Sequence, residues 1–311
     1  GREAFTYDHM DFFRPRSPAV YSPAYTIDQL VSNRHLDYRR HWLVERFEVM
    51  SGHVKVYAKN TVSGQQEFFE AKKLLLGAGA LNTSRIVLRS ATDTKTKLPI
   101  LDNPLSAFPI LSPRKVGMLS GKHDSAVAQL NLILSGNTSE SSVQSTIYTT
   151  NASCRTDVLF DFPLPVKSTS NLLKYTAAAT GVVLTFYNGI SHPENYVRLE
   201  SDNSLTVNYD AEPVHGTAEA KIIRLLRKMG FLSHPSLVQR LPMGSALHYA
   251  GLLPMRESPG RYECFPDGQL QGSPGVHIID GACFSSLPAK NLTFTIMANS
   301  MRIADTVSAS L

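Results

Sequence analysis

The stretch Pro288-Ala289-Lys290-Asn291-Leu292-Thr293-Phe294-Thr295, close to the carboxyl end of the chain, decides how the sequence is interpreted. It leads into a segment with helical character that ends near Asp305. Two shorter motifs precede it, Leu247-His248-Tyr249-Ala250-Gly251 and Asp280-Gly281-Ala282. An imidazole, a carboxylate and an amide therefore follow one another in a fixed order before the last predicted helix.

This order of motifs resembles the carboxy-terminal domain of the glucose-methanol-choline (GMC) family of FAD-dependent alcohol oxidoreductases. In that family a His and a second His or Asn lie beside the flavin ring and manage the proton of a substrate hydroxyl. His248 and Asn291 match those two positions. The resemblance implies FAD as cofactor and oxidation of a CH-OH group, in a sugar or another small-molecule alcohol, by hydride transfer.

The two residue types suit this chemistry. A neutral imidazole accepts a proton near physiological pH because its ordinary pKa is about 6.5, which makes His248 the candidate base. The Asn291 amide can donate to or accept from the same hydroxyl and hold the carbinol carbon in place. The chain has ten histidines, and without a surrounding motif a histidine is usually a surface or structural residue. We interpret His277, which lies in an apolar strand-like run, as structural.

Further cofactor contacts are implied by the resemblance at a glycine turn and at a hairpin strand. The turn Gly77-Ala78-Gly79 follows the apolar run Lys73 to Leu76, and we expect Thr83 or Ser84 to cap a helix after it. In the family such a turn lies near the adenosine end of FAD, and backbone groups matching Val44 lie against the adenine. The alternative for the turn is close strand-to-helix packing without a ligand.

Asp280 and Gly281 resemble the family's step near the FAD phosphates and ribityl chain. The alternative is an aspartate that caps the turn after a strand. Leu292 directly precedes the last predicted helix, Thr293 to Asp305, and Thr293 is its first residue. The resemblance implies that their amides face the pyrimidine edge of the flavin, where the helix dipole favours negative charge.

A flavoprotein of this kind needs a Gly-x-Gly-x-x-Gly turn that holds the FAD pyrophosphate at a helix N-terminus. The sequence has no such motif, because the single Gly-x-Gly, at Gly77 to Gly79, has Asn82 where the third glycine belongs. We therefore expect a partner that supplies it, as a separate amino-terminal FAD-binding chain or as a cleaved segment, which makes the assembly a heteromer.

The predicted fold class is mixed α/β, with a partial GMC-type FAD-binding domain and an inserted antiparallel-sheet substrate domain. We assign residues 1–100 to the FAD-binding domain, 101–240 to the substrate domain and 241–311 to the returning part with the catalytic pair. The expected elements are strands at 42–49, 53–57 and 68–76, alternating segments including 172–187 and 196–209, and a helix at 219–229.

Composition limits the other function classes. The 311 residues are 42% hydrophobic with a formal net charge of +5, and the basic residues are spread along the chain, so we predict no nucleic-acid partner. No apolar run is long enough for a membrane span, and the expected location is the cytoplasm. Three distant cysteines, Cys154, Cys264 and Cys283, fit neither a disulfide framework nor a metal site and are predicted to be free thiols.

Two departures from the family pattern keep other interpretations open. After the candidate base the family carries Thr and Gly where this chain has Leu252 and Arg256. One alternative is a GMC-like flavoprotein with non-oxidative, lyase-type chemistry, because a fold does not fix a function. Another is a non-catalytic assembly subunit.

Overall fold

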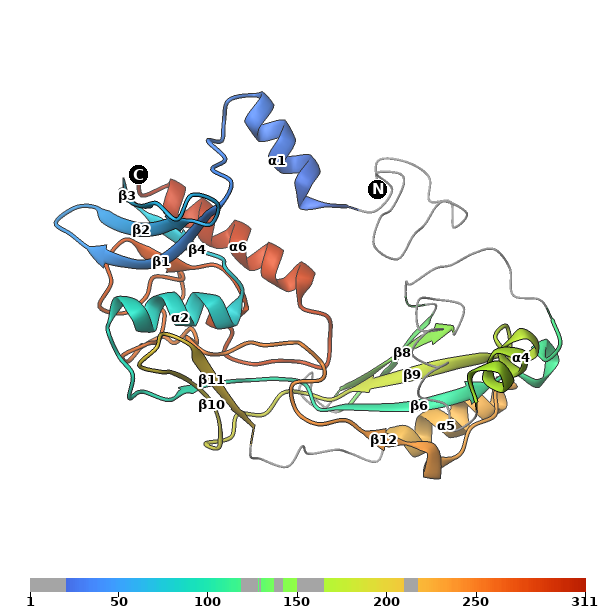
Figure 1. Cartoon of the computed structure of the whole chain (residues 1–311). Helices are drawn as coiled ribbons and strands as arrows, with labels where there is room; N and C mark the ends of the chain where they lie inside the picture. The colour runs from blue at the N-terminus through green and yellow to red at the C-terminus, as the bar shows by residue number, and fades with distance from the viewer. Residues whose placement is uncertain (1–20, 119–127, 129, 137–141, 150–164, 210–217) are drawn as a thin grey trace.

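The computed structural model describes residues 21–118, 128, 130–136, 142–149, 165–209 and 218–311, and within them the chain forms two lobes (Figure 1). The first lobe contains three small sheets and two long helices, with a further helix, α1 (Pro23–Ser32), beside it. The elements of the first lobe are β1 (Trp42–Val49), β2 (Val54–Asn60), β3 (Gln66–Ala71), β4 (Leu74–Leu76), α2 (Ala80–Ser90), β5 (Leu98–Pro99), β10 (Asn195–Leu199), β11 (Leu205–Tyr209), β13 (Val276–Ile278), η5 (Gly281–Cys283) and α6 (Thr293–Ser308).

The antiparallel meander β1-β2-β3 confirms the hairpins predicted from the sequence. Gly52 and Gly64 form its two turns with φ of +80° and +75°, a region that glycine enters without steric cost. The prediction of one strand over 68–76 was wrong. The chain changes sheets at Lys72 and Lys73, because β3 pairs antiparallel with β2 whereas β4 pairs parallel with β13.

The parallel pair β4 and β13 brings two distant segments together at their carboxyl ends. Leu74 lies opposite Val276, and Leu76 lies opposite Ile278. The glycine turn therefore begins beside the residues that lead to Asp280. In α/β proteins, ligands bind outside the carboxyl ends of parallel strands, so this pairing creates the type of edge at which a cofactor would be expected.

The second lobe is a five-stranded antiparallel sheet in the order β12-β6-β9-β8-β7, which confirms the predicted antiparallel sheet (Figure 1). One face packs against α5, where Ile222, Ile223 and Leu226 meet Phe108 and Val183. Its elements are β6 (Leu105–Leu111), β7 (Leu130–Leu134), β8 (Val143–Thr149), α4 (Val166–Thr176), β9 (Thr180–Phe186), α5 (Ala218–Lys228) and β12 (Gln239–Arg240), with short 3-10 turns η2 (Pro113–Lys115) and η4 (Pro235–Leu237).

Two segments within 101–240 differ from a simple sheet insert. The strand-like segment 172–187 begins as helix, because α4 extends to Thr176 and β9 begins only at Thr180. β10 and β11 pair with β5 and bury Val197 and Leu199 in the core of the first lobe. The chain therefore passes between the lobes more than once, and the connections near residue 102 and residue 188 lie where the lobes meet.

Helix α5 offers a matched test of its packing. Leu225 and Leu226 are adjacent in the chain, yet Leu225 is 41% exposed whereas Leu226 is fully buried. Leu226→Ala should lower the free energy of unfolding by about 2–5 kcal/mol, as large-to-small core substitutions do. The control Leu225→Ala should change it by less than about 1 kcal/mol. Urea titrations that gave equal losses would contradict the buried position of Leu226.

Candidate active site

The loop that carries His248 is held by a buried carboxylate from the junction of the lobes. Asp102 is 1% exposed. Its Oδ2 accepts from the amide of Gly244 at 2.7 Å, and its Oδ1 accepts from the amide of His248 at 3.2 Å. The residue before the histidine, Leu247, has φ of +57°, a left-handed conformation that is uncommon for a branched side chain. Asp102 therefore stabilises a loop conformation that the local sequence does not favour.

The imidazole ring of His248 is fixed on one edge and on one face. Its Nδ1 lies 2.8 Å from Oδ1 of Asn103, and its plane stacks on Phe186 with ring centroids 5.3 Å apart. Burial lowers the pKa of His248 below its ordinary value and outweighs the charge of Asp102, which acts in the opposite direction. The ring is consequently favoured as a neutral base.

Asn291, the second predicted catalytic residue, lies against the same sheet. Its Oδ1 accepts from Nε2 of Gln144 at 3.2 Å. Gln144 is directly opposite Phe186 in the β8-β9 register, and Phe186 stacks on His248. The two predicted residues thus contact neighbouring positions of adjacent strands. Sequence reasoning missed Asp102, Asn103 and Gln144, because their roles depend on a strand register and on contacts between distant segments.

The glycine turn connects β4 to α2. Gly79 is the N-cap of α2 with φ of +84°, and no atom lies within 4 Å of the position where a Cβ would stand. A Cβ on Gly77, by contrast, would lie 3.1 Å from Ile279. The prediction that Thr83 or Ser84 caps this helix was wrong. Thr83 lies in the first turn of α2, where its hydroxyl accepts from the amide of Ala78 at 3.1 Å.

Asp280 joins this turn to the end of β13. Its Oδ2 accepts from the Thr83 hydroxyl, and its Oδ1 accepts from the amide of Ala282 at 2.9 Å. Burial raises the pKa of Asp280, although hydrogen bonds from Thr83, Ala282 and Gly79 act to lower it. These contacts agree with the alternative interpretation of Asp280, an aspartate that caps the turn after a strand. The FAD contact expected for Asp280 stays a prediction.

Gly281 follows in the 3-10 turn η5, where it packs closely against the loop of His248. A Cβ on Gly281 would lie 3.2 Å from the carbonyl oxygen of Tyr249. The Gly281 carbonyl also accepts from the amide of Gly251 at 3.0 Å. Its small size therefore allows the η5 turn and the His248 loop to lie side by side.

Val44 is half-buried on β1, an edge strand of the meander, and packs against the main core. The register shifts between Val44 and Arg46, so a β-bulge interrupts the ladder beside it. The outer edge of β1 has backbone groups that no strand of the described chain pairs. The Phe47 amide on this strand donates to the Ser90 hydroxyl at 2.8 Å. The contact between backbone groups at Val44 and adenine, which the resemblance implies, stays a prediction.

Helix α6 confirms the predicted helix from Thr293 and extends it to Ser308. Leu292 is its N-cap residue and makes no side-chain cap hydrogen bond. The first amides of a helix have no partner within the helix itself. The backbone at Leu292 and Thr293 is thus suited to an external acceptor, and Leu292 is buried whereas Thr293 is exposed.

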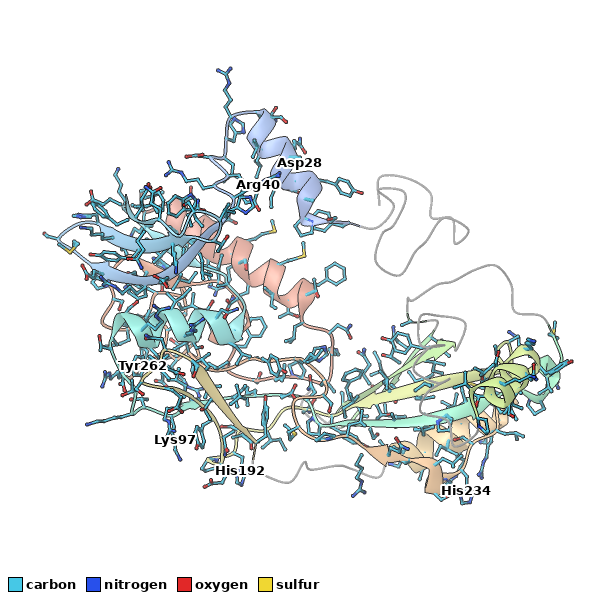
Figure 2. All side chains as sticks on the ribbon, in the orientation of Figure 1. Asp28, Arg40, Lys97, His192, His234 and Tyr262 are labelled. Atoms are coloured by element: carbon cyan, nitrogen blue, oxygen red, sulfur yellow. The ribbon has the colours of Figure 1, made fainter. Side chains whose placement is uncertain are left out.

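Other titratable residues stand apart from this constellation. Figure 2 shows His192 below β10 and β11 and His234 beside α5, and both are exposed. His277 is buried in β13, with Nδ1 3.3 Å from the carbonyl oxygen of Asp267. Among the described residues, no group of three His, Cys, Asp or Glu side chains could hold a metal ion. Cys264 and Cys283 are free and buried, as predicted, and Cys154 lies outside the described residues.

The two residues that depart from the family pattern have structural partners. Leu252 is fully buried in the core of the first lobe. Arg256 lies on the surface, with its guanidinium 3.5 Å from the carboxylate of Glu263. Packing and a surface ion pair account for both residues.

A cavity of about 560 Å³ lies between β1, α2 and the loop 261–273. Phe47, Val87, Tyr262 and Leu270 are among its lining residues, and none of the predicted site residues lines it. It is therefore distinct from the His248 site.

No helix in the described part of the chain combines the length and apolar character needed to cross a membrane.

Comparison with known proteins identifies the architecture. No family model matches the chain. The solved structure of pyridoxine 4-oxidase from Mesorbium loti matches with a TM-score of 0.54 at 15% identity, over 85% of this chain and 57% of that one. This similarity shows the fold. The C-glycoside 3-oxidase of Microbacterium trichothecenolyticum is 33% identical over 100 residues, which cover 30% of this chain and 19% of that protein.

The chain thus spans less than two thirds of the length of either protein that it matches. Both of those proteins are named as oxidases. The mixed α/β architecture with antiparallel sheets agrees with the predicted fold class.

The buried link between Thr83 and Asp280 can be tested without activity. Thr83→Val keeps the shape of the side chain but leaves the Asp280 carboxylate and the Ala78 amide without a hydroxyl partner. We expect unfolding to become easier by about 1–3 kcal/mol. Thr83→Ser retains the hydroxyl and should lose less than Thr83→Val in the same thermal or urea measurement. Equal losses would show that the hydrogen bonds contribute little.

The protonation of His248 gives a second test. Nuclear magnetic resonance titration should place its pKa below the ordinary 6.5, because burial disfavours the charged ring. The folded state then binds fewer protons than the unfolded chain, so this residue destabilises the fold increasingly as pH falls from about 6.5 through the folded pKa. His248→Gln assigns the signal. A pKa above 6.5 would mean that the Asp102 charge outweighs burial.

Proposed function

We propose that this chain carries the substrate domain and the catalytic residues of an FAD-dependent GMC-type oxidoreductase that oxidises a CH-OH group. The observation that carries the proposal is the fixed pair of His248 and Asn291. His248 is held by Asn103 and Phe186, and Asn291 by Gln144, against adjacent strands of one sheet. A half-buried imidazole and an exposed amide held against one sheet can serve as a base and a hydroxyl-positioning partner in alcohol deprotonation.

The proton chemistry follows from the side chains. As the carbinol carbon is oxidised, the hydroxyl proton passes to the free ring nitrogen of His248. Asn291 donates to or accepts from the same oxygen and orients the carbon. The low pKa of His248 keeps the ring neutral and ready to accept the proton. Bound FAD would supply the acceptor for the hydride that leaves the carbon.

Three features of the chain are suited to hold FAD. The turn Gly77-Ala78-Gly79 ends at a helix N-terminus and has open space at Gly79. The bulged edge strand at Val44 has an outer edge that no strand of the described residues pairs. The uncapped start of α6, at Leu292 and Thr293, favours negative charge. In this arrangement Asp280 and Gly281 join the turn to the His248 loop near the cofactor.

The substrate we propose is a sugar or a similar polyol. Gln144 and Thr146 project from the same face of β8, and the Thr146 hydroxyl donates to Oδ1 of Asn131 at 2.9 Å. Thr146 is buried beside the exposed Asn131, so Gln144 and Asn131 are the amides of this sheet face that a ligand beside Asn291 can reach. Polar side chains of this kind suit a ligand with several hydroxyl groups. The similarity to a C-glycoside 3-oxidase agrees with this choice.

We also propose an amino-terminal partner, a separate chain or a cleaved segment, that carries the Gly-x-Gly-x-x-Gly turn. Within the described residues β4 pairs with β13 alone, whereas parallel sheets normally have more strands and both faces covered. On α6, Phe294 is 83% and Met301 67% exposed. A strand added at the free edge of β4 would extend the sheet, and its helix would bury apolar surface of α6.

The experiment uses the whole protein that contains this chain, mixed without oxygen with a panel of sugars and simple alcohols. Absorption of the oxidised flavin should disappear with a substrate, and His248→Ala should slow this reduction by about 10²- to 10⁴-fold. The control His234→Ala, an exposed histidine, should leave the rate unchanged. Substrate consumed without flavin reduction would support the lyase alternative, and a protein that binds no flavin would support an assembly subunit.

A further inference from the structure

Asn103 is a buried amide with three partners from three different segments. It is 1% exposed. Its Nδ2 donates to the carbonyl oxygen of Tyr187 at 2.6 Å and to that of Pro288 at 3.3 Å. Its Oδ1 lies 2.8 Å from Nδ1 of His248. The side chain therefore links the end of β9, the segment that leads to Asn291, and the ring of the candidate base.

These partners fix which way the amide points. Backbone carbonyl oxygens only accept hydrogen bonds, so the NH2 group of Asn103 must face Tyr187 and Pro288. The oxygen of the amide then faces His248, and an amide oxygen also only accepts. The hydrogen between Asn103 and His248 must accordingly belong to Nδ1 of the ring. In a neutral imidazole, Nε2 is then the unprotonated nitrogen.

We propose that Asn103 is the positioning residue that holds His248 in its Nδ1-protonated tautomer and leaves Nε2 as the acceptor of the substrate proton. This assignment rests on the proposed function. Asn103 acts through His248 and has no contact with the reacting atoms in this scheme. Free histidine in water favours the opposite tautomer, with the proton on Nε2, in which the nitrogen needed as a base would be a donor.

The surroundings of the ring leave little freedom for another arrangement. Phe186 stacks on one face with an interplanar angle of 23°, and Asp102 holds the His248 backbone amide. Rotation of the ring about its Cβ–Cγ bond would place the Cδ2 carbon beside Asn103 in place of Nδ1, and the hydrogen bond to Asn103 would be lost. The same Asn103 amide binds the Pro288 carbonyl, three residues before Asn291. One side chain therefore sets the tautomer of the base and restrains the segment that carries its companion.

Two substitutions distinguish the effect of the Asn103 amide oxygen, which accepts from His248, from the effect of its NH2 group, which donates to Tyr187 and Pro288. Asn103→Leu has similar size and removes both. Asn103→Asp also removes the NH2 group but retains an oxygen that faces Nδ1. The two variants therefore lose the same contacts to Tyr187 and Pro288 and differ in the acceptor. Asn188→Ala is the matched control, because the Asn188 Oδ1 accepts from the amide of Ala289 at 2.8 Å in the same segment and makes no contact with His248.

Nuclear magnetic resonance on the whole protein, labelled with nitrogen-15 histidine, identifies the tautomer. The chemical shifts of the two ring nitrogens of His248 show which nitrogen carries the proton. Each protein is measured without substrate, at a pH above its own His248 pKa. We expect a protonated Nδ1 and a bare Nε2 in the unsubstituted protein, in Asn103→Asp and in Asn188→Ala. In Asn103→Leu the population should shift toward protonated Nε2. Flavin reduction should slow by at least about 10-fold, which is part of the roughly 10²–10⁴-fold contribution of a positioned base.

A protonated Nε2 in the unsubstituted protein would overturn the assignment, even if Asn103→Leu does not fold. An unchanged tautomer in Asn103→Leu would overturn it as well. Failure of the proposed function gives a different result, since the expected tautomers would be present while no alcohol reduces the flavin. The measurement therefore separates the role of Asn103 from the identity of the reaction.

Discussion

The buried pair Asp102-Asn103 is the contact on which the arrangement of the site depends. Both residues are 1% exposed, at the point where the chain passes from the first lobe into β6. The Asp102 carboxylate accepts from three backbone amides, those of Asn103, Gly244 and His248. A carboxylate removed from water is stable only when it is hydrogen-bonded in this way. The loop of His248 is thus folded around Asp102, and its ring is oriented by the next residue in the chain.

A second constraint is the parallel pairing of β4 and β13. It brings Gly77 to Gly79 beside Asp280, although about two hundred residues separate them along the chain. Thr83 and Asp280 then close the turn with a buried hydrogen bond. Gly281 continues from Asp280 into contact with the loop of His248. The glycine turn and the His248 loop are consequently parts of one packed unit.

The sequence indicated the residues that we propose as catalytic more readily than the residues that position them. His248, Asn291 and the start of α6 stand in recognisable local motifs, and the apolar spacing of α5 predicted that helix. Asn103 and Gln144 stand in no such motif. Their partners are 145 and 147 residues away, so their roles appear only when the strand register is known. Thr83 was interpreted as a helix cap because a hydroxyl near a helix start usually is one, whereas here it binds Asp280.

Our central proposal is that this chain completes a flavin site in a larger assembly. The most direct measurement is the absorption spectrum and the intact mass of the protein purified from its natural source. We expect bound flavin in a one-to-one ratio with this chain, together with a polypeptide segment that carries the Gly-x-Gly-x-x-Gly turn. A complete natural protein that contains this chain, is colourless and takes up no added FAD would contradict it.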